Sequence, residues 1–168
     1  MGKIYQSMTE LIGHTPLLAA QRFSREESLP SALLVKLEYF NPAGSVKDRI
    51  AAAMIEDAEK RGLLTKDSVI VEPTSGNTGV GLAMVAAKLG IKLILTMPSS
   101  MSIERQKLIA AFGAKIELTD PKFGMKGAVD RANELAASTP NSFIPSQFDN
   151  PSNPKAHFQS TGPEIWEQ

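Results

Sequence analysis

Short aliphatic segments alternate with longer segments of helical periodicity along most of this chain. The aliphatic segments predict strands at residues 32–37, 68–72, 92–97, 115–118 and 143–144, and the periodic segments predict helices at residues 46–61, 78–89, 102–112 and 126–137. Such alternation is typical of βαβ units, in which helices connect parallel strands. The sequence therefore predicts an α/β fold with a parallel, doubly wound sheet in three layers, flanked by helices and containing about three and a half βα repeats.

The first two predicted helices have recognisable ends. Ser45 can cap the helix 46–61, and Gly62 can end it. Gly90 follows the last residue of the helix 78–89 and can end that one. The apolar positions of this second helix predict one buried face, formed by Leu82, Val85, Ala86 and Leu89.

The last part of the sequence predicts an irregular connection and then a new helix. Prolines and asparagines are frequent over residues 141–154, which is typical of a loop. Thr161 and Glu164 have the spacing of a capping box, and Pro163 suits the first turn of a helix. Because domains seldom end so soon after a capped helix start, we expect further polypeptide beyond Gln168.

The composition excludes several kinds of chemistry. The absence of cysteine excludes disulfides, thiolate metal sites and a cysteine nucleophile. With only two histidines, His14 and His157, no metal site is expected, and we interpret both as turn or packing residues. Equal numbers of basic and acidic residues, 18 of each, leave no net charge to attract nucleic acid or an anionic membrane. Because the chain has neither a signal-peptide pattern nor a long apolar run, a cytoplasmic protein is expected.

A lysine occupies the first turn of the predicted helix 46–61. The amino-terminal end of a helix carries a partial positive charge, which disfavours an ammonium group and favours the neutral form of Lys47. A neutral amine is the nucleophile that Schiff-base chemistry requires. In the alternative interpretation, Lys47 extends into solvent and only Ser45 and Asp48 matter, as the cap and the partner of the helix dipole.

A glycine-rich loop lies between the predicted strand 68–72 and the helix 78–89. Loops in this position place backbone N–H groups at a helix amino terminus, which makes an anion site. The side chains of Thr74, Ser75, Asn77 and Thr78 add further donors, so the loop predicts a cup for a carboxylate or a phosphate. The alternative is a tight turn that is rich in small residues for steric reasons.

Two better-known glycine or serine motifs do not match this loop. Gly76, Gly79 and Gly81 have the spacing G-x-x-G-x-G rather than G-x-G-x-x-G, and no acidic residue ends the next strand, so a dinucleotide site is disfavoured. Ser75 lacks the G-x-S-x-G context of a serine hydrolase. In a parallel sheet, the cup would share one edge with Lys47, the segment 98–102 and Gln147.

Together these segments resemble a known family. The sequence Asn-Pro-Ala-Gly-Ser-Val-Lys-Asp-Arg at residues 41–49, followed by Pro-Thr-Ser-Gly-Asn-Thr-Gly at residues 73–79, resembles the cysteine synthase (O-acetylserine sulfhydrylase) family. These are fold-type II pyridoxal-phosphate enzymes with a fold like that of the tryptophan synthase β subunit. Further similar segments follow the same order, so that the resemblance covers essentially the whole chain: residues 12–17, 97–105, 147–151 and 161–166.

The resemblance implies a cofactor, a reaction and roles for individual residues. Lys47 would form a Schiff base with pyridoxal 5′-phosphate and then act as the base at the substrate Cα, while Asn77 would hold the ring hydroxyl of the cofactor. The implied reaction is a β-replacement that converts O-acetyl-L-serine and sulfide to L-cysteine, by a transferase. The implied substrate-binding residues are Thr74, Ser75, Gly76, Thr78, Met101 and Gln147.

The resemblance also implies a domain organisation and partners. Residues 1–168 would be the amino-terminal part of such an enzyme, with a small substrate-binding subdomain at about residues 45–150. The loop that binds the cofactor phosphate would lie in the part beyond Gln168. The full enzyme would be a homodimer, with serine acetyltransferase as a regulatory partner. Positions 99 and 100 are both serine where the family typically has Glu-Thr, which affects a mobile loop near the substrate.

Two other functions remain open. A cystathionine β-synthase shares the lysine and the Ser-Gly-Asn motif but uses homocysteine as the nucleophile. Alternatively, the chain is a truncated, non-catalytic binding module that acts through protein contacts and exposes an apolar patch.

Overall fold

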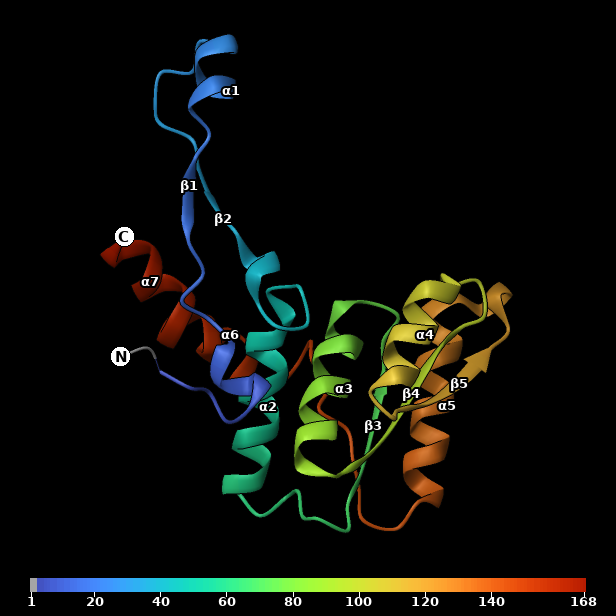
Figure 1. Ribbon diagram of the computed structural model, residues 1–168. Coiled ribbons are helices and arrows are strands. Elements are labelled where there is room, and N and C mark those ends of the chain that lie inside the picture. The colour runs from blue at the N-terminus through green and yellow to red at the C-terminus, as the bar shows by residue number, and fades with distance from the viewer. Residues whose placement is uncertain (1–2) are drawn as a thin grey trace.

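The body of the molecule is built around a parallel sheet of four strands in the order β5-β4-β3-β6, of which Figure 1 labels β3, β4 and β5. The computed structural model describes residues 3–168. Neighbouring strands pair in parallel, so their carboxyl ends meet at the same edge of the sheet. The strands are β3 (Val69–Pro73), β4 (Lys92–Pro98), β5 (Lys115–Thr119) and β6 (Ser142–Phe143).

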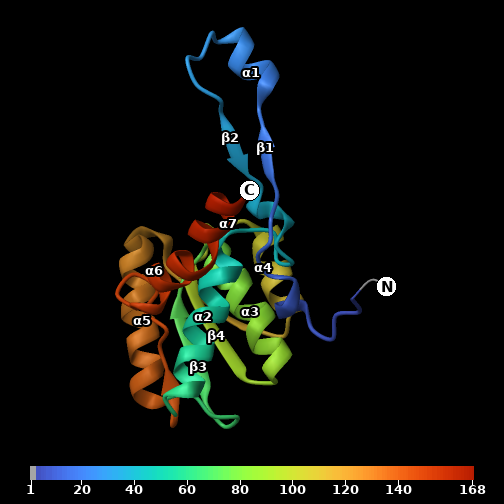
Figure 2. The ribbon, with the colours of Figure 1, turned by 90° about the vertical axis from the view of Figure 1, so that its left-hand side faces the viewer.

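Helices cover both faces of this sheet. Helix α5 (Gly124–Ser138) packs on β3 and β4 from one side, and α3 (Asn77–Leu89) and α4 (Ile103–Ala111) lie on the other (Figure 2). Helix α2 (Lys47–Lys60) packs against α3 and forms an outer layer. The predicted α/β fold is confirmed, since β3-α3-β4-α4-β5-α5-β6 gives three βα units and a final strand. A short 3-10 helix, Pro121–Phe123, precedes α5.

Helix α3 is buried on nearly every side. Its residues from Thr78 to Ala86 are all buried, because the sheet covers one face and α2 covers another. The predicted apolar face of Leu82, Val85, Ala86 and Leu89 does pack on the core, but burial extends well beyond it. A Cβ atom at Gly81 would lie 3.0 Å from Cβ of Ala51 and 3.2 Å from the carbonyl oxygen of Lys47, so the glycine is what lets α2 approach this closely.

The predicted strand at residues 32–37 is not part of the parallel sheet. Its centre forms β2 (Leu34–Lys36), which pairs antiparallel with β1 (Leu17–Ala19) in a separate ribbon. The ribbon projects from the body and carries α1 (Gln21–Glu26) near its far end (Figures 1 and 2). Strands of parallel sheets are buried on both faces, whereas Leu34 is 55% exposed here. The aliphatic run indicated a strand correctly but gave no information about its partner.

The carboxyl-terminal segment is more helical than predicted. Helix α6 (Ser152–Ala156), a π-helical turn (His157–Thr161) and α7 (Gly162–Glu167) follow one another directly, so the irregular connection ends at Pro151. A helix does begin directly after Thr161, with Pro163 in its first turn, but the predicted capping box does not form, because Thr161 already has helical backbone angles and makes no capping bond. Its hydroxyl bonds to Nδ1 of His157 at 2.9 Å instead of capping a helix.

The segment before the ribbon contains a 3-10 helix, Met8–Leu11, and a second one, Glu38–Phe40, follows the ribbon. His14 has a positive φ of 48°, which agrees with its interpretation as a turn residue.

None of the helices within residues 3–168 combines the length and the apolar character needed to cross a membrane.

Candidate functional site

The predicted site residues lie around the carboxyl edge of the sheet. The loop 74–76 follows β3, the segment 99–102 follows β4 and residues 144–147 follow β6, so all three leave the sheet at this edge. Two contacts join them. Thr78 donates a hydrogen bond to Oε1 of Gln147 at 2.7 Å, and Arg105 of α4 donates one to the carbonyl oxygen of Ser75 at 2.9 Å.

The loop after β3 presents an uncapped helix amino terminus. Gly76 precedes α3 with an extended backbone, and no side chain accepts a hydrogen bond from the first turn in the cap position. Instead, the Gly76 N–H donates to Oγ1 of Thr74 at 3.3 Å. The first N–H groups of a helix have no acceptor within the helix, so this end of α3 can bind an anion. The predicted cup therefore has the required backbone geometry, with Thr74 and Thr78 buried and Asn77 exposed.

Gln147 is held firmly at the edge of the cup. Its side chain is 8% exposed, and its backbone carbonyl accepts a hydrogen bond from Nδ2 of Asn153 at 2.7 Å. Because Thr78 bonds to Oε1, the amide N–H groups of Gln147 are not used in this contact and can donate to another group. Met101 lies half-buried against the apolar core, and its backbone carbonyl accepts a hydrogen bond from Gln106 at 2.9 Å.

Lys47 is the first residue of α2. Its backbone N–H donates to Oγ of Ser45 at 3.1 Å, so Ser45 does satisfy a first-turn donor although the helix begins one residue later than predicted. The Lys47 side chain is half-buried, and within residues 3–168 its Nζ forms no hydrogen bond or ion pair. Burial lowers the pKa of His157, and the nearby charges of Lys47 and Arg49 lower it further.

Asp48 holds the turn that precedes Lys47. The side chain is fully buried, and Oδ2 accepts a hydrogen bond from the Ala43 N–H at 2.6 Å. The other carboxylate oxygen has no partner within the described residues. Burial raises the pKa of Asp48 to about 6, and the charge of Glu38 contributes in the same direction. The alternative interpretation gave Asp48 a role at the helix terminus, but its bond to Ala43 makes it part of the turn.

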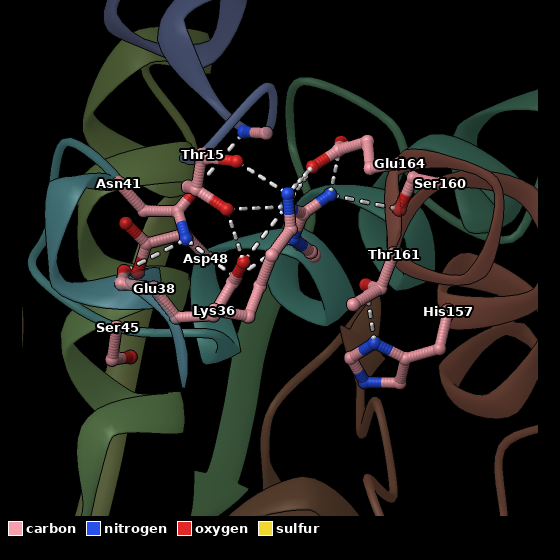
Figure 3. Close-up of polar contacts among 12 residues, drawn as sticks. Thr15, Lys36, Glu38, Asn41, Ser45, Asp48, His157, Ser160, Thr161 and Glu164 are labelled. Carbon is pink, nitrogen blue, oxygen red and sulfur yellow. Dashed lines mark hydrogen bonds and ion pairs between the residues drawn. The ribbon is translucent and has the colours of Figure 1, made fainter. Parts of the chain in front are cut away.

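Arg49 is the centre of a buried ionic cluster, and Figure 3 labels its partners Glu38, Ser160 and Glu164. Its guanidinium group donates to both carboxylate oxygens of Glu38, each at 2.8 Å, and to both oxygens of Glu164, each at 2.7 Å. Lys36 forms a further ion pair with Glu164 at 2.9 Å. Burial alone would raise the pKa of Glu164 and Glu38, but the hydrogen bonds from Arg49 hold both pKa values below their ordinary range.

The cluster joins four distant segments around the start of α2. The His14 N–H donates to Oε1 of Glu164 at 2.9 Å, and the Gly13 N–H donates to Oδ1 of Asn41 at 2.8 Å. The segment before β1, the end of the ribbon, the turn before Lys47 and α7 are thereby tied together. Sequence reasoning missed this cluster, although Arg49 beside Ile50 on the apolar half of the helix was a signal.

Sequence reasoning also missed Glu72. Its carboxylate accepts hydrogen bonds from the backbone N–H groups of Ser146 at 3.0 Å and Gln147 at 3.2 Å. A carboxylate that ends the aliphatic run 69–72 was the available signal, since such residues are rarely fully buried without a partner.

Comparisons with known proteins agree with the fold and with the resemblance. The family model described as pyridoxal-phosphate dependent enzyme matches residues 8–168. A cysteine synthase from Flavobacterium sp. is 57% identical over 161 residues, which cover 96% of this chain and 52% of the relative. Cysteine synthase A from Escherichia coli K12 is 52% identical over 168 residues, which cover 99% of this chain and 50% of the relative.

Solved structures are similar over the same extent. The cysteine synthase of Entamoeba histolytica has a TM-score of 0.91 and 41% identity, and the alignment covers 98% of this chain and 49% of that one. An O-acetylserine-dependent cystathionine β-synthase from Helicobacter pylori has a TM-score of 0.90 and 39% identity, with 99% and 54% covered. The chain spans about half the length of the relatives it matches. This chain belongs to the family of pyridoxal-phosphate-dependent enzymes.

Proposed function

We propose that this chain provides the lysine and the substrate-binding cup of a cysteine synthase, a transferase that converts O-acetyl-L-serine and sulfide to L-cysteine and acetate. The names of the most similar curated relatives support this activity. The observation that carries the proposal is the pairing of Thr78 with Gln147 at the amino terminus of α3, beside the α2 helix that begins with Lys47. Residues of about 45–150 would form the small substrate-binding subdomain.

The residues present fit an aldehyde cofactor. Pyridoxal phosphate needs one amine for covalent attachment, and the Nζ of Lys47 has no competing partner within residues 3–168. The exposed amide of Asn77 would donate to the ring hydroxyl. When bound, the cofactor supplies an electron sink for the carbanion that forms at the substrate Cα. The phosphate would be bound by residues beyond this chain.

The cup fits the carboxylate of an amino acid. Backbone N–H groups at the start of α3, with the hydroxyls of Thr74 and Ser75, would donate to it. Thr78 would hold Gln147 so that its free amide N–H groups face the same carboxylate. Met101, from the segment after β4, and Gly76 would line the cup.

Lys47 would also move a proton. The positive end of α2 favours a neutral amine, so Lys47 would take the proton from the substrate Cα. The Lys47 N–H donates to Oγ of Ser45 and the Ala43 N–H donates to Oδ2 of Asp48, and these two bonds would hold the Lys47 backbone in place during the proton transfer.

The test is turnover by the full-length protein with pyridoxal phosphate, O-acetyl-L-serine and sulfide. We expect Lys47→Ala to lose both cysteine formation and the visible absorbance of the bound cofactor. Lys60→Ala is a matched control at the exposed end of the same helix, and it should keep both. Turnover retained by Lys47→Ala would contradict the proposal, and the absence of cofactor binding in the unaltered protein would favour the non-catalytic module.

A second candidate is a cystathionine β-synthase type of β-replacement. The structural similarity to the Helicobacter pylori enzyme favours it, because that enzyme is also O-acetylserine dependent. The two activities differ only in the nucleophile. An assay with sulfide and homocysteine at equal concentrations would distinguish them by which thioether or thiol is formed.

The resemblance further supports a cytoplasmic homodimer that binds serine acetyltransferase and neither nucleic acid nor membrane. Sedimentation of the full-length protein would give its oligomeric state, and cell fractionation its location. Co-purification with a serine acetyltransferase would test the regulatory contact.

A further inference from the structure

Glu72 is a buried carboxylate that forms no ion pair within residues 3–168. It is 1% exposed and lies near the carboxyl end of β3, two residues before Thr74. Within residues 3–168, its hydrogen-bond partners are the consecutive backbone N–H groups of Ser146 and Gln147, at 3.0 and 3.2 Å. Burial raises the pKa of Glu72 although these two bonds act in the opposite direction. Burying a carboxylate costs free energy unless hydrogen bonds compensate it, so the groups that bond to Glu72 indicate its role.

The segment that contacts Glu72 has an unusual backbone. Ser146 has a φ of 53°, which non-glycine residues adopt only when the surrounding structure holds them. A residue in this conformation helps turn successive N–H groups towards one point and so creates a concave site for an anion. Here the carboxylate of Glu72 fills that site, and it reaches across 74 residues of sequence to do so.

Glu72 and Gln147 connect the sheet to the cup. Glu72 fixes the backbone N–H of Gln147, and the side chain of Gln147 in turn accepts the bond from Thr78 at 2.7 Å. Asn153 bonds the backbone carbonyl of Gln147 from the other side, at 2.7 Å. The position of the Gln147 amide therefore depends on a chain of contacts that starts at Glu72.

We infer that Glu72 is a positioning residue, which holds the 146–147 backbone so that the Gln147 amide faces the substrate carboxylate. The part of this inference that concerns substrate rests on the proposed function. Glu72 would act through the backbone of Ser146 and Gln147, the groups that it contacts. It acts from the strand, whereas the cup it serves is built on the loop and helix that follow.

Glu72→Gln tests this with almost no change in shape. The amide keeps one acceptor oxygen and places an NH₂ group against the second backbone N–H, so one charge-assisted bond becomes a repulsive contact. In the full-length protein with its cofactor, we expect the KM for O-acetyl-L-serine to rise about tenfold while kcat changes less than about threefold. Glu117→Gln on β5, whose carboxylate pairs with surface Lys115, is the matched control and should change neither.

Hydrogen exchange gives a readout that does not depend on activity. We expect the Ser146 and Gln147 amides to exchange slowly in the unaltered protein, and about tenfold or more faster in Glu72→Gln, while the amides of α3 and β4 keep their protection. Fast exchange of the two amides in the unaltered protein would overturn the inference even if the variant failed to fold.

The two proposals fail in different ways. If the unaltered protein forms no cysteine, the proposed function fails, whereas the protection of the two amides still reports on Glu72. If turnover occurs and Glu72→Gln keeps both the KM and the slow exchange of the unaltered protein, Glu72 has no positioning role. A loss of kcat with unchanged KM would also contradict the inference, because the effect would then lie in the chemical step.

Discussion

The apolar core and the ionic cluster both join distant parts of this chain, but they do so with opposite chemistry. The core between the sheet, α3 and α2 is built from aliphatic side chains whose attraction has no preferred direction. The cluster around Arg49 depends on five directed hydrogen bonds to Glu38, Glu164 and Ser160. Loss of Arg49 removes the guanidinium group that both carboxylates share, so we expect the cluster to respond to a single change at its centre more sharply than the core.

Removing the centre of the cluster is expected to have the largest effect. Arg49→Met should lower the free energy of unfolding by about 3–5 kcal/mol, because Glu38 loses the cation that pairs with it and Glu164 keeps only its pair with Lys36. Urea unfolding followed by circular dichroism measures this. Arg61→Met is the control at the residue that follows the same helix, where a surface pair with Asp57 contributes less than about 0.5 kcal/mol. Similar losses in both variants would remove the distinction between the cluster and ordinary surface pairs.

Truncating a core side chain should lower the free energy of unfolding somewhat less than Arg49→Met does, and this loss should depend differently on pH. Leu95→Ala on β4, which is fully buried, is expected to cost about 2–4 kcal/mol, whereas Leu118→Ala on β5, which is half-exposed, should cost well under 1 kcal/mol. The cost at Leu95 should not change with pH. The cost of Arg49→Met should shrink as pH falls below the ordinary range of glutamate, since Glu38 and Glu164 contribute their full stability above that range and lose it progressively as the pH falls towards their lowered pKa values. Equal pH profiles would contradict the comparison.

The two regions also differ in how well the sequence predicted them. The strands and helices from Lys47 to Phe143 follow from local periodicity, and the parallel topology then places Thr78 and Gln147 at one edge. The helix terminus indicated Lys47 as a nucleophile, whereas the resemblance alone gave its cofactor and the expected role of Asn77. The ionic cluster could not be predicted, because Arg49 meets Glu164 across 115 residues and pairing of charges has no sequence period. Glu72 was missed for the same reason.

Asp48 lies beside the cluster but should respond to pH with the opposite sign. Its pKa of about 6 exceeds the ordinary value of an aspartate, so the folded protein keeps a proton that the unfolded chain has lost, and stability falls as pH rises between about 4 and 6. Asp48→Asn removes this cost and keeps an acceptor for the Ala43 N–H. We expect the variant to be more stable than the unaltered protein by up to about 3 kcal/mol at pH 7 and equally stable below about pH 4. Thermal unfolding across this range checks the prediction, and a variant that is less stable at pH 7 would contradict it.

The smallest expected effect concerns Gly81, where the core meets the helix that carries both Arg49 and Lys47. Alanine favours a helix by about 1 kcal/mol over glycine, but its Cβ would lie 3.0 Å from Ala51 and 3.2 Å from the Lys47 carbonyl, and such overpacking costs about 1–3 kcal/mol. Gly81→Ala should therefore destabilise the protein by about 1 kcal/mol in urea unfolding. Gly162→Ala, which meets only an ordinary contact at 3.4 Å, should stabilise it slightly. Since the overpacking moves the start of α2 away from α3, we also expect Gly81→Ala to weaken cofactor binding by the full-length protein, measured by spectral titration. Unchanged binding together with lost stability would mean that the ionic cluster, and not the close approach of the two helices, fixes the position of Lys47.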